Sequence, residues 1–526
     1  MKKRILLYLI VIFGGLTSCG KFLEEYSQNQ VYVRTAEDLN ELLVGECFML
    51  GNNVSVSSQE TMSSLGSYNY QWLHVMDDDS EEFLLGELPL TAASPRNVLG
   101  PFHQWGSDPF STLEKKQYKD NAWERFYSYI AVLNSIIYKV GDLRGKEKDV
   151  ELLDKVEGEA FFLRASYYFL LVNIYGKPYR KESASKDAGV PLKITEVIED
   201  KYFSRDPVGT VYAQIVSDLK RSATCLKNVN PVSPWRVGPG AVNALLSRVY
   251  LYMEEYDLAI EAADKVLANA YGILDLNQRK AEENFLYSGS PELIFTQGGN
   301  SIPAIFINDS ISAWQGNDKR ASSFQVSDDL LECYEPTDLR KSIFFKFSTK
   351  ARAILPEKYK TWINRDDKEG VDQDFIIRLP EVILNKAEAL AMLKRDVEAK
   401  VELEKLRSKR FKVADLKPVT ETGEALVNFI RDERRRELCF EGHRWFDLRR
   451  YAVNSIYPLS ADFSIKHTNY SYEANSQTWY ADGYYELDSY WKDEAAWIVP
   501  IPNYAIEFNK GSLTNEIRSE RDLKRN

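Results

Sequence analysis

The segment RDERRRELCFEGHRWFDLRR, residues 431–450, decides the fold, and its density of acids, bases and a histidine is typical of an active site. Its glutamates recur every four residues and so lie along one stripe of an α-helix: Glu433, Glu437 and Glu441. The arginines at 434–436 place a positive charge three or four positions from these carboxylates. The pattern therefore predicts a partly buried helix whose charges neutralise one another locally, a structural lattice of ion pairs rather than a catalytic site.

The end of this segment predicts where the helix stops. Gly442 suits a helix C-terminus that needs a left-handed residue. Asp447 follows at a distance that suits the cap of the next turn. We therefore expect the helix to end here and a capped turn to follow.

Composition limits the class of protein. A chain of 526 residues with 44% hydrophobic residues can bury a large core. The net charge is -11 and no basic tract stands out, which argues against a nucleic-acid partner. Aromatic residues reach 13%, with 31 Tyr and 10 Trp, and such an excess is typical of surfaces on which a ligand or a partner stacks.

The first 18 residues predict a signal peptide. A basic start, Lys2-Lys3-Arg4, precedes an apolar run at 5–13 that is too short to span a bilayer. Leu16-Thr17-Ser18-Cys19 then resembles the lipobox of bacterial lipoproteins, in which the cysteine is acylated. We expect lipid chains on Cys19 to anchor the protein to a membrane without spanning it, the alternative being a signal peptide with an incidental cysteine.

The remaining cysteines and histidines lack the spacing of a metal site. Cys47, Cys225, Cys333 and Cys439 are far apart and form no CxxC pair, so zinc is not expected; disulfides stay open, and Cys439 is expected to be a buried thiol. The acidic run at 77–79 lacks EF-hand spacing, and we interpret it as a solvated or helix-capping loop rather than a calcium site. No nucleotide or hydrolase motif occurs, and we expect no cofactor.

Apolar periodicity predicts a mostly α-helical chain. Helices are expected at residues 35–43, 121–140, 152–175, 208–226, 241–270 (as two), 375–394, 396–410 and 421–440. Short strand-like runs occur at 293–295 and 343–345. Two long irregular excursions, residues 51–118 and 271–370, interrupt the helices, and excursions of this size are usually functional.

A repeat of 140 residues indicates the architecture. Ala259 and Ala399 lie in matching contexts, and small and large residues alternate in register around them: Ser247, Tyr250, Ala263 and Val266 against Ala387, Leu390, Leu403 and Leu406. This alternation resembles the tetratricopeptide pattern of stacked helix pairs. The predicted fold is a tetratricopeptide-like scaffold with large irregular loop excursions and a few short strands.

Four segments, taken in order, resemble the SusD/RagB family of surface lipoproteins: residues 157–176, 378–389, 434–450 and 497–509. Two departures are the short Lys177-Pro178 link and a tail without the usual Asn-Pro-Gly end. The resemblance implies a signal peptide (1–18), a SusD-like N-terminal region (19–270) and a RagB/SusD C-terminal region (271–526). It also implies an outer-membrane, outward-facing protein that binds glycan, performs no chemistry and partners a SusC-type TonB-dependent transporter.

Aromatic residues in the excursions are the candidate glycan ligands, because sugars stack on aromatic rings and offer hydroxyls to nearby polar groups. Trp105 is flanked by Gln104, Ser107 and Asp108 and is preferred together with Trp314, although loop tryptophans also plug scaffolds. The full candidate set is Tyr70, Trp72, Trp105, Trp314 and Asn317. A further aromatic patch at 470–491 suits either a β-structured cap or a partner surface.

These features together predict an oligosaccharide-binding lipoprotein. A peptide-capturing member of the same family and a glycoside hydrolase are the alternatives, and a purely structural tetratricopeptide adaptor is a third. With 78 acidic residues, pairs of carboxylates alone carry no information about hydrolysis.

Overall fold

The computed structural model of the chain describes residues 33–49, 69–84, 95–117, 119–231, 233–279, 285–299, 301–306, 323–349, 352–358, 371 and 374–525. It is 46% helix and 11% strand, so the predicted mostly α class with short strands is confirmed. Trp314, Asn317 and Cys19 lie outside the described residues.

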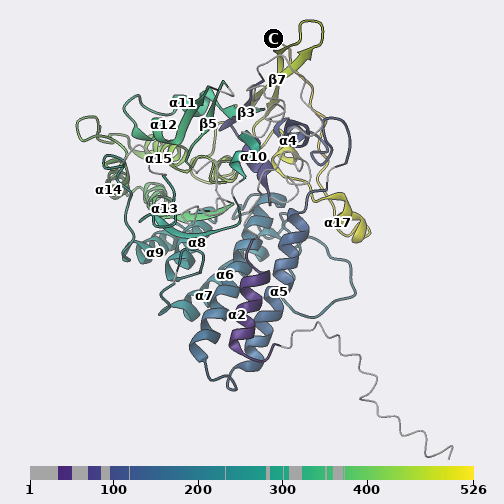
Figure 1. Cartoon of the computed structure of the whole chain (residues 1–526), viewed down its shortest axis with the longest axis vertical. Helices are drawn as coiled ribbons and strands as arrows, with labels where there is room; N and C mark the ends of the chain where they lie inside the picture. The colour runs from purple at the N-terminus through teal and green to yellow at the C-terminus, as the bar shows by residue number, and fades with distance from the viewer. Residues whose placement is uncertain are drawn as a thin grey trace, which may run out of the picture.

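Long helices of the first half form the lower end of the molecule (Figure 1): α2 (Ala36–Glu46), α5 (Ala122–Leu143), α6 (Val150–Tyr175) and α7 (Val208–Leu226). Thr35 and Asp38 form the predicted capping box at the start of α2. The second half of α6 is buried on every side because α2, α5 and α7 all pack against it. Gly158 permits the closest approach, since a Cβ there would lie 2.5 Å from the Cγ of Leu226 on α7.

The predicted repeat is confirmed in two helix pairs, α8 (Pro239–Tyr252) with α9 (Tyr256–Leu267) and α13 (Leu379–Met392) with α14 (Asp396–Arg407). Both pairs turn through a left-handed residue at the same register, Glu254 (φ 58°) and Lys394 (φ 61°). α13 packs against α8 and α9, so the two pairs stack. A hydrogen bond of 2.9 Å from Asn385 Nδ2 to Ser247 Oγ crosses this interface.

Two predicted elements are wrong in part. Residues 375–378 form strand β6 (Phe375–Arg378), antiparallel to β2 (Leu293–Gln297), and α13 begins only after it. Pro380 fits this boundary because it lies in the first turn of α13, where the N–H that proline lacks would have no partner within the helix. The run at 343–345 ends helix α12 (Leu339–Phe344) and starts β4 (Phe345–Ser348), which pairs with β5 (Ala353–Pro356).

The upper end of the molecule gathers short elements from both excursions and the tail (Figure 1). β1 (Ser80–Glu82) pairs with β3 (Phe324–Val326), and β7 (Ile465–Glu473) forms a hairpin with β8 (Thr478–Leu487). The other described elements are η2 (Gln71–Val75), α4 (Pro95–His103), α10 (Ile302–Phe306), α11 (Asp328–Glu332), α15 (Gly423–Leu438), α16 (Arg444–Ala452), η3 (Glu494–Trp497) and α17 (Asn503–Phe508).

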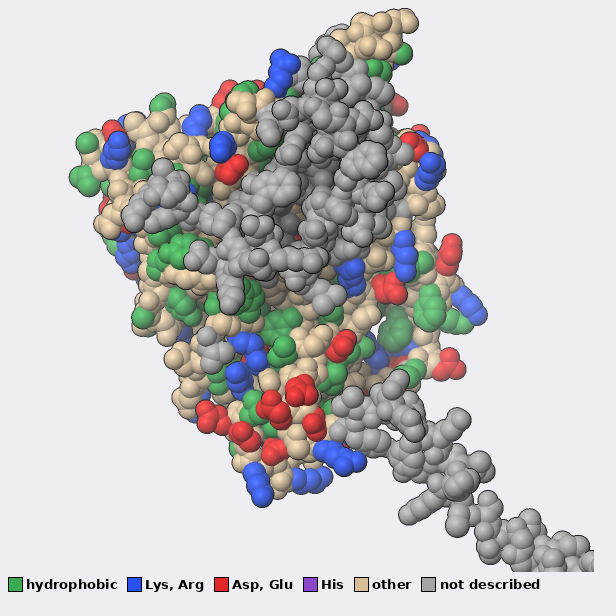
Figure 2. All heavy atoms as spheres, in the orientation of Figure 1, with side chains coloured by type: hydrophobic (Ala, Val, Ile, Leu, Met, Phe, Trp, Pro, Cys, Tyr) green, Lys and Arg blue, Asp and Glu red, His purple; other side chains and the backbone are tan. Residues whose placement is uncertain are grey.

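The described surface mixes charges of both signs. Figure 2 shows acidic side chains gathered toward the lower, helical end, with lysine and arginine side chains beside them. No helix in the described part of the chain has both the length and the apolar character required to cross a bilayer.

Candidate functional site

The segment at 431–450 folds as α15, a tight break and α16. Phe440 (φ 59°) and Gly442 (φ 76°) both adopt the left-handed conformation, as predicted for Gly442. Asp447 does not cap the second helix; it lies inside α16, where its carboxylate accepts hydrogen bonds from Arg434 (2.7 Å) and Arg450 (2.8 Å).

The three glutamates of α15 and its break are fully buried and paired, which confirms the predicted ion-pair lattice. The prediction of local neutralisation is wrong for Glu437 and Glu441. Glu437 accepts from arginines of three other segments: Arg378 (2.7 Å), Arg410 (2.8 and 2.9 Å) and Arg340 (3.0 Å). Glu441 pairs with Lys358 and Arg378, and Glu433 alone has a helical neighbour as partner, Arg436 at 2.9 Å.

The lattice holds its carboxyl groups in the charged form. Burial by itself would raise the pKa of Glu437. The charges of Arg410 and Arg378 outweigh this effect and keep the pKa well below its usual range. His443 is in the opposite position: burial, with Arg248 and Arg434 nearby, lowers its pKa well below its usual range. Neither group is poised to exchange protons at neutral pH, so this cluster has the properties of a scaffold.

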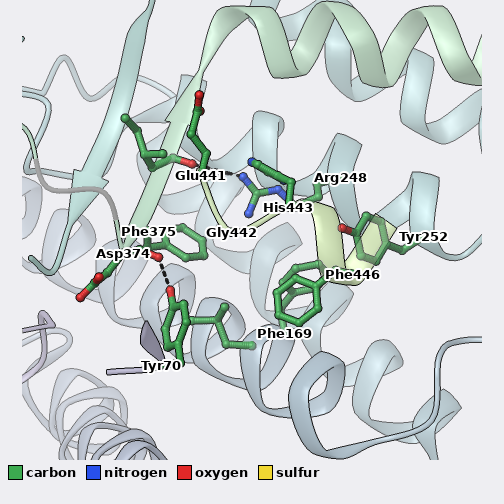
Figure 3. Close-up of a pocket in the computed structure, with 12 residues that line it drawn as sticks. Tyr70, Phe169, Arg248, Tyr252, Asp374, Phe375, Glu441, Gly442, His443 and Phe446 are labelled. Atoms are coloured by element: carbon green, nitrogen blue, oxygen red, sulfur yellow. Dashed lines mark hydrogen bonds between the residues drawn. The ribbon is translucent and has the colours of Figure 1, made fainter. Parts of the chain in front are cut away.

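A small cavity lies beside this lattice (Figure 3). Its volume of about 20 Å³ is enough for about one water molecule and too small for a sugar ring. Tyr70 and His443 face it from opposite sides, and the Tyr70 hydroxyl donates to the Asp374 carbonyl. Tyr70 is therefore a buried packing residue here.

Trp72 and Trp105 are also buried, and the expectation that they offer a ring face to a ligand does not fit their positions. The Trp72 ring stacks on Phe102 with ring centres 5.0 Å apart, and its Nε1 donates to Asp120 (2.9 Å). Trp105 is 0% exposed, and its Nε1 donates to the Met76 carbonyl (2.9 Å). Because other protein groups cover both rings, neither ring has a face open for a sugar to stack on.

A larger open depression lies next to the turn that carries Trp105, and the residues on both sides of Trp105 line it. Its volume is about 420 Å³, within the range of small-ligand sites. The polar neighbours that singled out Trp105 in the sequence do line it, and residues from β8 and the tail complete it. The lining residues are Pro101, Gln104, Gly106, Ser107, Asp108, Ser111, Thr112, Leu113, Lys115, Tyr485, Glu520 and Arg521.

A strained turn after α4 produces this arrangement. Trp105 has a φ of 48°, a left-handed conformation that is uncommon for a bulky residue, and the Gly106 N–H donates to the Pro101 carbonyl (2.8 Å). The turn buries the tryptophan ring and leaves Gln104 and Ser107 on the wall of the depression. Strain of this kind is often found at functional sites.

The tail reaches the depression by pairing with the hairpin. Tyr484 and Lys524 exchange two backbone hydrogen bonds of 2.8 and 2.9 Å. Arg521 is fixed by the Glu486 carbonyl (2.7 Å) and by the Asp493 carboxylate. No local sequence pattern pointed to Arg521, because its neighbours in space lie in other segments.

The chemistry of the depression suits a polyhydroxylated ligand. It presents two cations (Lys115, Arg521), two carboxylates (Asp108, Glu520) and several hydroxyl and amide groups. Burial raises the pKa of Tyr485, so its phenol stays neutral and able to donate a hydrogen bond. Tyr485 belongs to the aromatic patch noted at 470–491, but the pattern did not distinguish it from its neighbours.

The acidic run at 77–79 is largely buried, and two of its three carboxylates are ion-paired rather than solvated. Arg444 binds Asp78 through two contacts of 2.7 Å, and Arg435 binds Asp79 at 2.8 Å. These arginines occupy oxygens that a calcium ion would need.

The cysteines of the described residues are free thiols: Cys47, Cys225, Cys333 and Cys439. Cys439 is buried as predicted, and burial raises its pKa to about 12.

Comparison with known proteins identifies relatives along most of the chain. Residues 22–251 match a family model described as starch-binding associating with outer membrane, and residues 324–516 match the SusD family. SusD-like protein P38 of Formosa agariphila is 26% identical over 407 residues, covering 64% of this chain and 74% of the relative. SusD-like protein P25 of the same organism is 22% identical and covers 89% of this chain and 93% of its own length.

Solved structures share the fold. A SusD superfamily protein from Bacteroides thetaiotaomicron matches with a TM-score of 0.68 at 22% identity, covering 92% of this chain and 100% of that one. A SusD-like carbohydrate binding protein from Bacteroides vulgatus matches with a TM-score of 0.61 at 16% identity, covering 91% and 97%. The two family models, the relatives and the shared fold agree, and the chain belongs to the SusD-like family.

Proposed function

We propose that this protein binds an oligosaccharide in the depression next to the Trp105 turn and delivers it to a SusC-type TonB-dependent transporter at the outer membrane. The observation that carries the proposal is the depression itself, about 420 Å³ in volume and lined by polar groups around one aromatic ring. One of the two matching family models is described as starch-binding and associating with the outer membrane, which supports the same function. The protein acts as a binding protein and not as an enzyme.

The lining supplies the two kinds of contact that sugar recognition needs. Tyr485 offers an aromatic face for the C–H side of a sugar ring, and aromatic contacts contribute about 0.5–1.5 kcal/mol beyond area burial. Gln104, Ser107 and Lys115 offer donors to the hydroxyls, and Asp108 offers acceptors. The balance of two cations against two carboxylates favours a neutral glycan over a strongly charged one.

Three residues outside the described part complete the proposal. Trp314 and Asn317 remain proposed ligand residues on the strength of their sequence context. Cys19 remains the proposed site of acylation that holds the protein on the membrane, facing the cell exterior. A Cys19→Ser variant should leave the membrane fraction and lose radiolabelled palmitate, and retention of both would contradict the anchor.

Titration calorimetry of the purified protein against a panel of neutral oligosaccharides tests the binding site. We expect Tyr485→Ala to weaken binding about 5- to 10-fold, because about 1.4 kcal/mol corresponds to tenfold. Tyr480→Ala is the matched control, since Tyr480 lies on the same strand, is 48% exposed and does not line the depression. Equal losses in the two variants would place the ligand elsewhere.

The same material separates the alternative functions. A heat of binding on titration with peptides, and none on titration with glycans, would identify a peptide-capturing protein. New reducing ends on the glycan after incubation would identify a hydrolase. Purification of the protein from detergent-solubilised native membranes tests the partner, because a TonB-dependent transporter should co-purify with it. If the protein is recovered and no such transporter accompanies it, delivery to that transporter is contradicted.

A further inference from the structure

The last described residues of the chain form a strap, residues 518–525, beside the β7–β8 hairpin at the upper end of the molecule (Figure 1). Near its end, Lys524 forms an antiparallel bridge with Tyr484 of β8. At its start, Arg518 donates to the Ile498 carbonyl (2.7 Å). The strap is therefore attached at both ends, and its two residues that line the depression lie between these attachments.

Gly483 on β8 makes room for the strap. A Cβ at this position would collide with the carbonyl oxygen of Lys524 and would lie 3.2 Å from Leu523 Cδ1. The φ of Gly483, 155°, also lies in the region that favours glycine. The strap can therefore approach the hairpin this closely only because residue 483 has no side chain.

Polar contacts supply most of the attachment of the strap. Leu523 is only half-buried, and Ile517, which precedes the strap, is 94% exposed. A segment with few buried apolar contacts opens locally at a smaller cost than the core does. We therefore expect the strap to detach from the hairpin while the rest of the molecule stays folded.

Arg521 is fixed with part of its guanidinium still available. Nη1 donates to the Glu486 carbonyl (2.7 Å), Nη2 donates to the Asp493 carboxylate, and the buried Nε has no partner among the described residues. Each Nη atom carries two N–H groups, so one N–H on each remains after these contacts. Arg521 lines the depression, and these two N–H groups are the donors that it retains for a ligand.

We propose that Arg521 is a ligand-binding residue, placed by the strap, whose two remaining N–H groups donate to neighbouring hydroxyls of a neutral sugar. This inference rests on the proposed function, because it concerns a ligand in the same depression. A guanidinium presents its donors in a fixed planar fork, which suits two acceptors side by side. Asp493 already balances the charge of Arg521, so a neutral diol fits better than a second carboxylate.

A bound ligand should also hold the strap in place. The lining of the depression comes from three parts of the chain: the segment 101–115, Tyr485 on β8, and Glu520 with Arg521 on the strap. A ligand that fills the depression makes all of its contacts only while the strap is attached. Binding therefore favours the attached form over the detached one.

Hydrogen exchange of the full-length protein without ligand tests the attachment, read by mass spectrometry at the Lys524 amide, which donates to the Tyr484 carbonyl (2.9 Å). We expect Gly483→Ala to raise this exchange rate about fivefold or more, because overpacking a close contact shifts the opening equilibrium by at least that factor. Gly145→Ala is the matched control, since Gly145 also has a positive φ (87°) but a Cβ there would have no neighbour within 4 Å. An unchanged rate, or the same increase in both variants, would overturn the role of the strap.

Titration calorimetry against neutral oligosaccharides tests the ligand contact. We expect Arg521→Ala to weaken binding about tenfold, the usual effect of losing a hydrogen bond from a charged group, and Arg521→Lys to recover part of the loss. Arg525→Ala is the control, because Arg525 is exposed and does not line the depression. If Tyr485→Ala weakens binding and Arg521→Ala does not, the assignment of Arg521 is overturned.

The two measurements separate this inference from the proposed function. A wild type that binds no oligosaccharide would overturn the proposed function and the ligand contact of Arg521 with it, while the exchange rates still decide the role of the strap. Saturating neutral ligand should slow exchange at the Lys524 amide, and a lack of protection would contradict the coupling. If a uronic acid oligosaccharide binds more tightly than its neutral counterpart and Arg521→Ala removes that advantage, the preference for a neutral diol is wrong.

Discussion

Glu437 compensates three buried positive charges. Its carboxylate meets the guanidinium groups of Arg340, Arg378 and Arg410 in a fully buried site. Removal of one partner from a buried ion pair leaves the other charges uncompensated and typically costs about 3–5 kcal/mol. We expect Glu437→Gln to lower the free energy of unfolding by about that amount, measured by urea denaturation.

An exposed ion pair supplies the control for this substitution. Glu261 and Lys265 are one helical turn apart on α9, with side chains 62% and 57% exposed. Exposed pairs contribute about 0.3–0.5 kcal/mol, so Glu261→Gln should change stability by no more than that. Similar effects of the two substitutions would mean that burial does not strengthen the lattice.

Trp105 shows what a sequence can and cannot predict about a site. Its polar neighbours marked this loop as a candidate ligand segment, because hydrogen-bonding groups in an irregular segment are solvated or bind ligands, and three of these neighbours line the depression. The direction of the ring depends on a left-handed turn and on His467, which lies 362 residues further along the chain. Tyr485 and Arg521 reach the same place only through tertiary packing, and no local pattern encodes that meeting.

The contact between α6 and α7 permits a test at the scale of an element. A Cβ at Gly158 would lie 2.5 Å from Leu226 Cγ and 3.0 Å from Cys225 Cβ. Alanine favours helix over glycine by about 1 kcal/mol, but overpacking of a tight interface costs about 1–3 kcal/mol. We expect Gly158→Ala to lower the melting temperature, measured by circular dichroism.

Gly141 is the matched control, because it also lies inside a long helix, α5, but a Cβ there would have no neighbour within 4 Å. Gly141→Ala should raise the melting temperature through its helix preference, worth about 0.5–1 kcal/mol. A stabilising effect at both positions would mean that α6 and α7 can separate without loss.

The elements differ in how far the sequence determined them. The helix start at Thr35 and the helix pairs around Ala259 and Ala399 depend on residues close together in the sequence. The elements predicted from them were confirmed. Residues 375–378 were predicted as the start of a helix, because this apolar run leads directly into the helix that follows. The segment is a strand because β2 lies beside it, and pairing with a distant segment leaves no mark in a local pattern.

The whole molecule should weaken in acid because its lattice is built on charged carboxylates. Burial opposes the charged form of Glu437, Glu441 and Asp447, yet their arginine and lysine partners lower each pKa below its usual value. A lowered folded pKa contributes stability above the unfolded value, about 4, that is lost as pH falls. We expect the melting temperature to fall steeply below about pH 4.5 in a thermal scan series, and less steeply for Glu437→Gln. Parallel profiles would contradict this assignment.

The two regions divided at residue 270 should unfold together. α13 of the second packs against α8 and α9 of the first, and Arg248 of α8 binds Glu381 of α13 in a buried pair (2.7 Å to Oε2). Arg449 of α16 also donates to the carbonyls of Asn173 and Gly176 at the end of α6. We expect a single transition in scanning calorimetry, and two well-separated transitions would show instead that the regions are independent.

The lattice around Glu437 also bears on how long the protein persists once folded. Its members meet across long stretches of chain, as Arg410 and Glu292 do at a separation of 118 residues. Contacts between such distant positions tend to form late in folding, after the loops between them have closed. Interactions absent from the transition state do little to speed folding but slow unfolding. The lattice therefore acts chiefly on the lifetime of the native state, which governs resistance to irreversible unfolding.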